Sequence, residues 1–313
     1  MSIMVTGGTG LIGSRIIRKL VERGEEVVSF DLAPPRPSVL ALSDSVKAYR
    51  GDITQIPHLL EAINLHQVHQ IIHMAALLPP DTEDRPHFGM QVNIQGTNNV
   101  FEVARWTDMQ RVVYASSIAV YGVQETFGER PLVEDDLTDP VNVYGMTKAA
   151  NDFSARKYRE RYGLDIRGIR ICTVFGHGRV TGMTGMIGGL MMSLPAIGQP
   201  VAMPFRPQEA SPMIHAEDAA EIFVQVALSQ RLNHHVYLSG GHLATIQDMA
   251  DLVRGFIPNA QISTGDQAVP HVYLVDNSRM LADIGYEMAP LRVRVLDHIN
   301  DARQEAGLPL ISG

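Results

Sequence analysis

The chain has 313 residues, of which 45% are hydrophobic and 19% charged, so it can bury a large core and is neither disordered nor low-complexity. Its formal net charge of −8 argues against nucleic acid as a partner. The single cysteine, Cys172, excludes an intramolecular disulfide and a cysteine-cluster metal site, and a lone thiol is typical of the reducing cytoplasm.

The N-terminal residues carry no targeting signal. Residues 1–6 run directly into a strand-like segment, without the basic region or small-residue cleavage site of a secretory leader. Nowhere does the chain hold the roughly 20 uninterrupted apolar residues that span a bilayer. We therefore expect a cytoplasmic protein that is mature from residue 1 and has no membrane segment.

Short β-branched runs alternate with longer helical patterns along the first half of the chain. This rhythm predicts βαβ units, and hence an α/β fold with a doubly wound parallel sheet and helices on both faces. The predicted strands are 3–6, 27–31, 70–75 and 111–116, and the predicted helices are 12–23, 86–106 and 144–162.

The amino-acid composition changes after Phe175. Residues 176–198 are rich in Gly and Met, and we interpret them as the substrate side of the molecule. The strand and helix rhythm is expected to resume only at Met213. The predicted elements beyond it are helices 216–229, 245–256 and 291–306 and a short strand at 235–239.

A glycine-rich turn follows the first strand and opens the first helix, with Gly7, Gly10 and Gly13 at its key positions. Such a turn lets the backbone approach a pyrophosphate, and the helix N-terminus beyond it offers free N–H groups. Asp31 stands 18 residues after Gly13, where a carboxylate binds ribose hydroxyls and repels a ribose phosphate. The pattern predicts NAD rather than NADP, although Arg36 in the following loop is a candidate phosphate contact.

Two further segments bear on the cofactor. Asp52 follows a short strand and either accepts a hydrogen bond from the adenine amino group or caps the helix that begins near Pro57. His73, Met74, Ala75 and Ala76 end a strand in mostly small residues, which leaves room for a bound molecule.

A phenol and an ammonium lie four residues apart on one helical face, at Tyr144 and Lys148. A nearby ammonium lowers a tyrosine pKa from about 10 toward neutral, so we expect Lys148 to make Tyr144 a working base. Ser116 and Ser117 end a strand at the sheet edge where open α/β sheets bind ligands. Ser117 is predicted to hydrogen-bond the same substrate oxygen, with a strand-end cap as the alternative.

These motifs together resemble the extended short-chain dehydrogenase/reductases, also called the NAD-dependent epimerase/dehydratase family. The resemblance implies a Rossmann domain over 1–175, to which residues 213–240 return, and a smaller, mainly substrate-binding region over 176–313. It also implies a catalytic triad of Ser117, Tyr144 and Lys148. The segments that carry the resemblance are 6–13, Asp31, 52–53, 73–76, 92–97, 116–122, 144–148 and 170–176.

The same resemblance implies the cofactor contacts and the assembly. Family members commonly pair the helices equivalent to 86–106 and 144–162 between subunits, which implies a homodimer. The residues expected against NAD, besides Tyr144 and Lys148, are Gly7, Gly10, Leu11, Ile12, Gly13, Asp31, Asp52, Ile53, Met74, Ala75, Ala76, Leu78, Asn93 and Cys172.

The chain departs from the family where nucleotide-sugar epimerases hold the substrate diphosphate. Thr173 stands in place of the usual asparagine and Ser211 in place of the usual arginine, with Arg179 and Arg206 nearby as candidate substitutes. The acidic residue that dehydratases carry after the serine position is also missing, because Ile118 follows Ser117. A small polar substrate is therefore favoured over a nucleotide-sugar.

Three functions remain open from sequence. The first is NAD-dependent oxidation of a secondary hydroxyl on a sugar, sugar acid or hydroxy amino acid. The second is epimerisation of a sugar or nucleotide-sugar through a transient ketone, and the third is a non-catalytic NAD sensor.

Side-chain roles in the substrate-side region are open as well. The methionines there form either an adaptable lid or a helix core, and Met183, Met186, Met191 and Met192 are the candidates. His177 and His215 are either substrate contacts or structural residues. No spacing of His or acidic residues suggests a metal.

Overall fold

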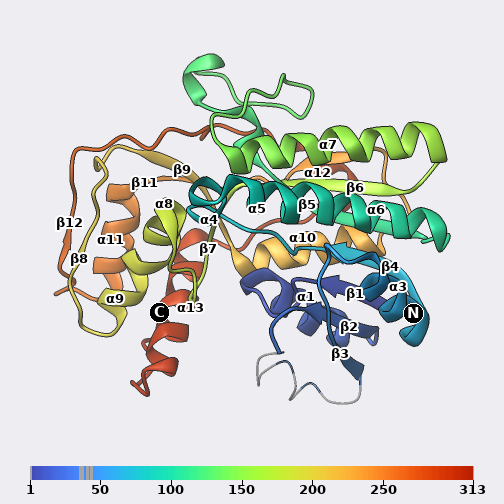
Figure 1. The fold of residues 1–313 in the computed structure, drawn as a ribbon. Helices are drawn as coiled ribbons and strands as arrows, with labels where there is room; N and C mark the ends of the chain where they lie inside the picture. The colour runs from blue at the N-terminus through green and yellow to red at the C-terminus, as the bar shows by residue number, and fades with distance from the viewer. Residues whose placement is uncertain (1, 35–38, 40–41, 43–44, 313) are drawn as a thin grey trace.

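The computed structural model describes residues 2–34, 39, 42 and 45–312. Seven parallel strands form its main sheet in the order β10-β6-β5-β4-β1-β2-β3 (Figure 1). The strands are β1 (Ser2–Thr6), β2 (Glu26–Asp31), β3 (Val46–Arg50), β4 (Val68–His73), β5 (Arg111–Ser117), β6 (Ile166–Ile171) and β10 (Val236–Leu238). The chain builds outward from β1 to β3 and then returns to the other side of β1, which confirms the predicted doubly wound fold.

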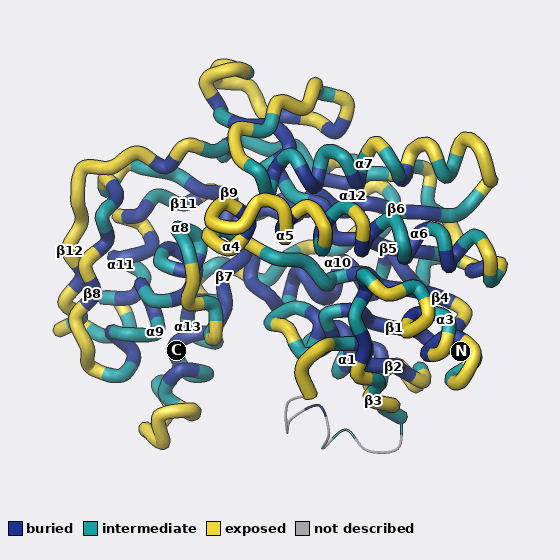
Figure 2. The backbone as a smooth tube through the Cα atoms, viewed as in Figure 1, coloured by how far each residue is buried: buried dark blue, intermediate teal, exposed yellow. Residues whose placement is uncertain are grey.

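Alternate side chains of each strand pack into two separate cores, one on each face of the sheet. Ile3 and Val5 of β1 pack with α1 and α10, whereas Met4 packs with α3, α6 and α7 on the opposite face. The central strand β1 is buried throughout, and exposed residues gather on the outer helix faces and loops (Figure 2). The helices that cover the sheet are α1 (Leu11–Glu22), α10 (Ala216–Leu228) and α12 (Ser278–Ile284) on one side, and α3 (Ile56–His66), α6 (Thr97–Trp106) and α7 (Val143–Tyr162) on the other.

The helix predicted over 86–106 is interrupted. It consists of α5 (Pro86–Met90), a π-helical segment η2 (Gln91–Gly96) and then α6. Such π segments occur often at functional sites. Here the wide turn contains the fully buried Asn93, whose amide reaches the loop that follows β4.

A smaller region with its own core lies beside the carboxyl ends of the main strands (Figure 1). Its three-stranded sheet runs β11-β9-β7, and β8 pairs with β12. The elements of this region are β7 (Thr173–Phe175), α8 (Gly182–Gly185), the π-helical η5 (Met186–Leu190), α9 (Met191–Ala196), β8 (Val201–Ala202), β9 (Ala210–His215), β11 (His242–Thr245), α11 (Ile246–Phe256), β12 (Ile262–Ser263) and α13 (Leu291–Glu305).

One expectation about this region needs correction. Residues 176–198 are not without regular structure, because α8, η5 and α9 occupy 182–196. Their glycines allow turns to pack directly on neighbouring backbone, so a composition that suggests a loop here forms helices. Met191 and Met192 are fully buried in the local core, as the core interpretation predicts. Met183 and Met186 are partly buried and pack against the same core, and Met183 also lines the cavity described below.

Three short helices complete the chain near the cavity. They are α4 (Asp81–Asp84), the 3-10 turn η3 (Ile118–Tyr121) and the 3-10 turn η4 (Gln124–Thr126). Across the described part of the chain, every helix is too short or too polar to cross a membrane.

Candidate active site

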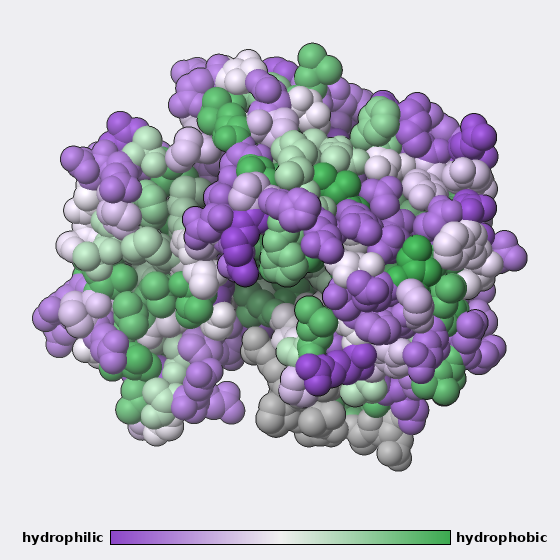
Figure 3. Space-filling view, viewed as in Figure 1, coloured by the Kyte–Doolittle hydropathy of each residue, from purple (hydrophilic) through white to green (hydrophobic). Residues whose placement is uncertain are grey.

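A cavity of about 700 Å³ opens at the carboxyl ends of the main strands. The surface is hollowed between the main sheet and the smaller region, with apolar side chains at the bottom (Figure 3). Reversal of strand order between β1 and β4 leaves such a crevice in doubly wound sheets. The catalytic and cofactor-binding residues expected from the sequence line it, except Asn93: Gly7, Gly10, Leu11, Ile12, Gly13, Asp31, Asp52, Ile53, Met74, Ala75, Ala76, Leu78, Ser117, Tyr144, Lys148 and Cys172.

The glycine-rich turn forms one wall of this cavity. Gly7 has a φ of +69°, and a Cβ there would lie 2.8 Å from the Ala75 nitrogen, so a side chain would force two loops apart. The N–H of Gly10 donates to the Gly7 oxygen at 3.0 Å, and among the described residues no side chain caps the start of α1 at Gly10. The first-turn N–H groups of α1 therefore remain available to an anion at the cavity wall. This cradle fits a pyrophosphate.

Asp31 is tied to that turn. Its Oδ2 accepts hydrogen bonds from the Thr9 backbone nitrogen at 3.0 Å and from the Thr9 hydroxyl at 2.7 Å. Its Oδ1 accepts from the Ala33 nitrogen at 3.2 Å. The carboxylate is thus oriented at the end of β2 beside the turn, where it suits a diol. Arg36, the candidate phosphate contact, lies outside the described residues.

Asp52 does not cap the helix that follows it. Gln55 holds the cap position of α3, while Asp52 Oδ1 accepts from the Thr54 nitrogen at 2.8 Å and closes a tight turn. Of the two roles left open by the sequence, the cap is wrong. Asp52 lines the cavity beside Ile53 and remains a candidate adenine contact.

Asn93 is placed differently from the expectation that it touches the cofactor. It lies behind the loop after β4, where its Oδ1 accepts from the Leu77 nitrogen at 2.8 Å and its Nδ2 donates to the Leu77 oxygen at 3.0 Å. A further bond joins it to Thr147 of α7 at 3.2 Å. In this structure Asn93 therefore holds the cavity loop in place rather than lining the cavity.

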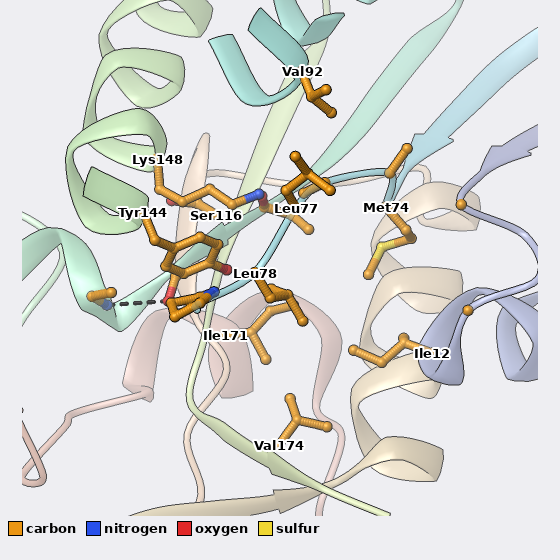
Figure 4. A pocket seen from close by; sticks show the side chains of 18 of the residues that line it. Ile12, Met74, Leu77, Leu78, Val92, Ser116, Tyr144, Lys148, Ile171 and Val174 are labelled. Carbon is orange, nitrogen blue, oxygen red and sulfur yellow. Dashed lines mark hydrogen bonds between the residues drawn. The ribbon is translucent and has the colours of Figure 1, made fainter. Parts of the chain in front are cut away.

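The catalytic candidates come from β5 and α7. Tyr144 and Lys148 lie one turn apart on the face of α7 that points into the cavity (Figure 4). Asn142 caps the helix by accepting from the Gly145 nitrogen at 2.7 Å. Glu83 of α4 accepts from the nitrogens of Val143 and Tyr144 at 3.0 and 3.1 Å, a contact that nothing in the local sequence indicates.

Ser117 closes the group at the end of β5. Its hydroxyl accepts from the Ala119 nitrogen at 3.1 Å, which is the strand-end cap considered from the sequence. The same side chain is hydrogen-bonded to Tyr144. Ser117 therefore serves as the strand-end cap and lies beside Tyr144 in the cavity, and its contact with a substrate oxygen stays a prediction.

The electrostatics of the pair differ from the simple expectation that Lys148 lowers the pKa of Tyr144. Burial raises the pKa of Tyr144, and the charge of Arg179 and the hydrogen bond with Ser117 oppose that rise. Burial also lowers the pKa of Lys148 to about 8. Its Nζ donates to the Ala115 oxygen at 2.8 Å and lies 5.6 Å from the centroid of the Tyr144 ring. A buried amine that itself loses its proton readily is a weak stabiliser of a phenolate.

Cys172 also lines the cavity, but as an inert group. Burial raises the pKa of its thiol to about 12, so the thiol stays protonated. Its backbone nitrogen donates to the Ser239 hydroxyl at 3.0 Å, which fixes the chain between the two sheets.

The positions at which the chain departs from its family are now located. Thr173 lines the cavity, whereas the Ser211 hydroxyl lies 3.0 Å from Nε2 of His271, and His271 is the lining residue. Arg179 lines the cavity as well. Arg206 is exposed and paired with Glu209 at 2.6 Å, outside the described lining. His271 comes from a distant loop, and no sequence pattern points to it.

His177 and His215 have structural roles. His177 bridges Ser193 and Glu305 at 3.0 and 2.8 Å, and the His215 ring caps α10 by accepting from the Glu217 nitrogen at 3.3 Å. Neither belongs to the described lining of the main cavity. Within the described ranges, His, Cys, Asp and Glu do not gather in threes that could hold a metal ion.

Comparison with known proteins identifies the fold and the motifs. The model of the NAD dependent epimerase/dehydratase family matches residues 3–239. UDP-glucuronate 4-epimerase 1 of Arabidopsis thaliana is 32% identical over 188 residues, which cover 56% of this chain and 43% of that protein. UDP-glucose 4-epimerase of Halalkalibacterium halodurans is 34% identical over 165 residues, which cover 52% of this chain and 48% of that protein. The chain thus spans about half the length of the curated relatives it matches.

Solved structures match the whole architecture at low identity. A GalE-like L-threonine dehydrogenase from Cupriavidus necator superposes with a TM-score of 0.84 at 24% identity, over 96% of this chain and 99% of that one. The UDP-glucose 4-epimerase of Thermus thermophilus, in complex with NAD, gives 0.85 at 23% identity, over 97% and 99% of the two chains. At this identity the match shows the fold, and dehydrogenases and epimerases share it.

The buried amine of Lys148 predicts how stability responds to pH. Its pKa is about 8 in the folded protein and 10.5 by its ordinary value, so between these pH values only the unfolded chain holds the proton. The free energy of unfolding of the cofactor-free protein should therefore rise with pH across this window. Between about pH 7 and about pH 10, we expect the wild type to gain about 1–3 kcal/mol relative to Lys148→Met.

Urea unfolding at the two pH values measures this difference. Lys157→Met is the matched control, because Lys157 is exposed on the same helix and pairs with Glu160 at 2.7 Å. It should follow the wild type. Equal pH responses of the wild type and Lys148→Met would show that Lys148 is not perturbed by its surroundings.

Proposed function

Because the chain belongs to the NAD dependent epimerase/dehydratase family, whose cofactor is NAD, we propose that it oxidises, and in reverse reduces, a secondary hydroxyl of a small polar substrate. The observation that carries this proposal is the convergence of Ser117 and Tyr144 in the same cavity as the glycine-rich turn. A proton acceptor and a dinucleotide cradle then face one enclosed space.

Each of the three catalytic candidates has a separate role in this proposal. Tyr144, as a phenolate, takes the hydroxyl proton of the substrate through its Oη. Ser117 donates its hydroxyl hydrogen to the same substrate oxygen and so orients it. Lys148 donates one hydrogen bond from its Nζ to the Ala115 oxygen at the bottom of the site. Its remaining N–H groups would bind the cofactor ribose.

The residues on the cavity walls support a specific set of cofactor contacts. The N-terminus of α1 and the turn at Gly7 and Gly10 would hold the pyrophosphate, Asp31 the adenosine ribose, and Asp52 the adenine amino group. When bound, NAD supplies the acceptor for the hydride that leaves the substrate carbon as its hydroxyl becomes a carbonyl. Asn93 acts here by keeping the loop at Leu77 in position.

The smaller region supplies the substrate side. Arg179, Met183, Thr184 and His271 line the cavity from residues 176–313, and Thr173 comes from the strand just before them. The arginine of nucleotide-sugar epimerases is replaced by Ser211, whose partner is His271. This supports a sugar, sugar acid or hydroxy amino acid as substrate.

Epimerisation is the second candidate, and the relatives that act on UDP-glucuronate and UDP-glucose favour it. It uses the same residues twice. Tyr144 takes the proton in the first half and returns it after the ketone has turned its other face to the reduced cofactor. Net NADH distinguishes the two, because an epimerase ends each turnover with NAD.

Removing the base tests the mechanism. Tyr144→Phe removes the hydroxyl but keeps the ring, so turnover should fall by about 100- to 10,000-fold while NAD binding changes little. Tyr162→Phe, on the exposed end of the same helix, should retain wild-type rates. The measurement is steady-state kinetics together with a titration of NAD. Activity that survives in Tyr144→Phe would exclude Tyr144 as the base.

Removing the Asp31 carboxylate tests the ribose assignment. Asp31→Ala should weaken NAD about 10- to 100-fold through loss of charged hydrogen bonds, and should reduce the preference for NAD over NADP. Asp251→Ala, at an exposed carboxylate of α11, is the control. Dissociation constants for both cofactors decide the matter, and an unchanged preference would contradict the assignment.

We further propose that a second copy packs on α5, α6 and α7. Large apolar side chains are exposed on these helices, namely Phe88, Trp106, Phe153 and Tyr162. Sedimentation should give twice the chain mass, and Phe153→Glu should shift the protein toward the monomer. Leu137→Glu, on an exposed loop, should not. A monomeric wild type at micromolar concentration would contradict the dimer.

A further inference from the structure

Arg179 is a partly buried cation whose charge the described protein residues leave unneutralised. Its Nη2 donates to the Thr184 hydroxyl at 2.6 Å, but its Nε is buried without a hydrogen-bond partner. No described carboxylate lies within 4.0 Å of it. The buried Arg170, by contrast, pairs with Asp152 at 2.8 Å. An unpaired charge that is partly removed from water is costly, so the partner of Arg179 is expected to be a ligand.

The guanidinium is located at the chemical end of the cavity. Arg179 lines the cavity together with Ser117 and Tyr144, and it is close enough to Tyr144 for each charge to affect the pKa of the other. Asp31, by contrast, stands beside the glycine-rich turn. The charge of Arg179 therefore faces the substrate rather than the adenosine half of the cofactor.

The arginine is held in place by its surroundings. A Cβ at Gly189 would lie 1.7 Å from the Arg179 oxygen, so η5 packs directly on the backbone of Arg179. Thr184 of α8 fixes one edge of the guanidinium. Preorganised donors of this kind bind a ligand without an additional ordering cost.

The charge balance selects the kind of anion. At this end of the described lining, Lys148 is engaged with Ala115, and burial lowers the pKa of His271, which is therefore neutral. His271 Nε2 donates to the Ala210 oxygen at 3.0 Å. Lys148 bonds to the Ala115 oxygen and is assigned to the cofactor ribose, so Arg179 is the cation left for the substrate. A single guanidinium matches a carboxylate better than a diphosphate with two negative charges.

We propose that Arg179 binds a carboxylate of the substrate, so that the protein acts on a small hydroxy acid. This inference rests on the proposed function and makes it more specific. The substrate carboxylate pairs with the free edge of the Arg179 guanidinium, and its secondary hydroxyl lies at Ser117 and Tyr144. Thr184 is then a positioning residue for the guanidinium.

The test compares hydroxy acids with their neutral amides. L-Threonine, 3-hydroxybutyrate and D-glucuronate are each assayed beside the corresponding primary amide, with NAD, for the wild type, Arg179→Gln and Arg179→Lys. The wild type should prefer one acid over its amide by about 10- to 100-fold in kcat/KM, and Arg179→Gln should bring that ratio close to one. Arg179→Lys should retain part of the preference, since lysine keeps the positive charge but loses the two parallel N–H donors of the guanidinium.

Arg206→Gln is the matched control, because Arg206 also belongs to the smaller region but pairs with Glu209 outside the described lining. It should keep the acid preference. If Arg179→Gln slows acid and amide equally and shifts the pH profile, Arg179 acts only on Tyr144 and the inference is overturned. Turnover of UDP-glucose that does not depend on Arg179 would also overturn it.

A binding measurement separates this inference from the proposed function. The NAD-loaded Tyr144→Phe protein is titrated calorimetrically with each acid. The same titration is then carried out on the double variant that carries both Tyr144→Phe and Arg179→Gln. Binding that is lost with Arg179, in a protein whose wild type oxidises none of the alcohols, would support the carboxylate site and contradict the function. Oxidation of neutral alcohols that does not depend on Arg179 would support the proposed function and contradict the carboxylate site.

Discussion

The structure depends on the reversal of strand order between β1 and β4. Both strands are parallel and buried on two faces, so their carboxyl ends meet at one edge while the connections leave in opposite directions. At that edge Thr6 of β1 bonds to Nδ1 of His73 at 2.7 Å, and Nε2 of His73 lies 3.0 Å from the hydroxyl of Thr97 on α6. Burial keeps this histidine neutral by lowering its pKa to about 3. The loops after β1 and β4, which line the cavity, start from this fixed edge.

The ionisable groups in the cavity, Tyr144, Lys148 and Arg179, do not by themselves give a charged Tyr144 and a paired Arg179. Burial moves Tyr144 and Lys148 toward their neutral forms, in opposite pKa directions. Arg179 remains the charged group that favours the phenolate, and its own anionic partner is missing among the described residues. Binding of ligands with the right charges would therefore complete both the recognition and the activation of Tyr144, which couples specificity to chemistry.

Sequence reasoning succeeded where the determining pattern is local. The turn from Gly7 to Gly13 and the pair Tyr144 and Lys148 can be read within a few residues, and so can the alternation of strands and helices. It says less where contacts join distant segments. The bonds between Asn93 and Leu77 depend on a π turn that periodicity does not show. The cap that Glu83 provides to α7 and the position of His271 likewise follow from tertiary packing. The helices within 182–196 were hidden by a composition that usually forms loops.

The central claim is that Ser117 and Tyr144 serve net oxidation of a hydroxyl rather than its inversion. The most direct measurement is nicotinamide absorbance during incubation of the protein with NAD and separate panels of hydroxy acids, free sugars and UDP-sugars, with each mixture also analysed for isomers. The account predicts stoichiometric NADH and a carbonyl product with a small hydroxy acid. An isomerised product without NADH, above all from a UDP-sugar, would contradict it and make the protein an epimerase.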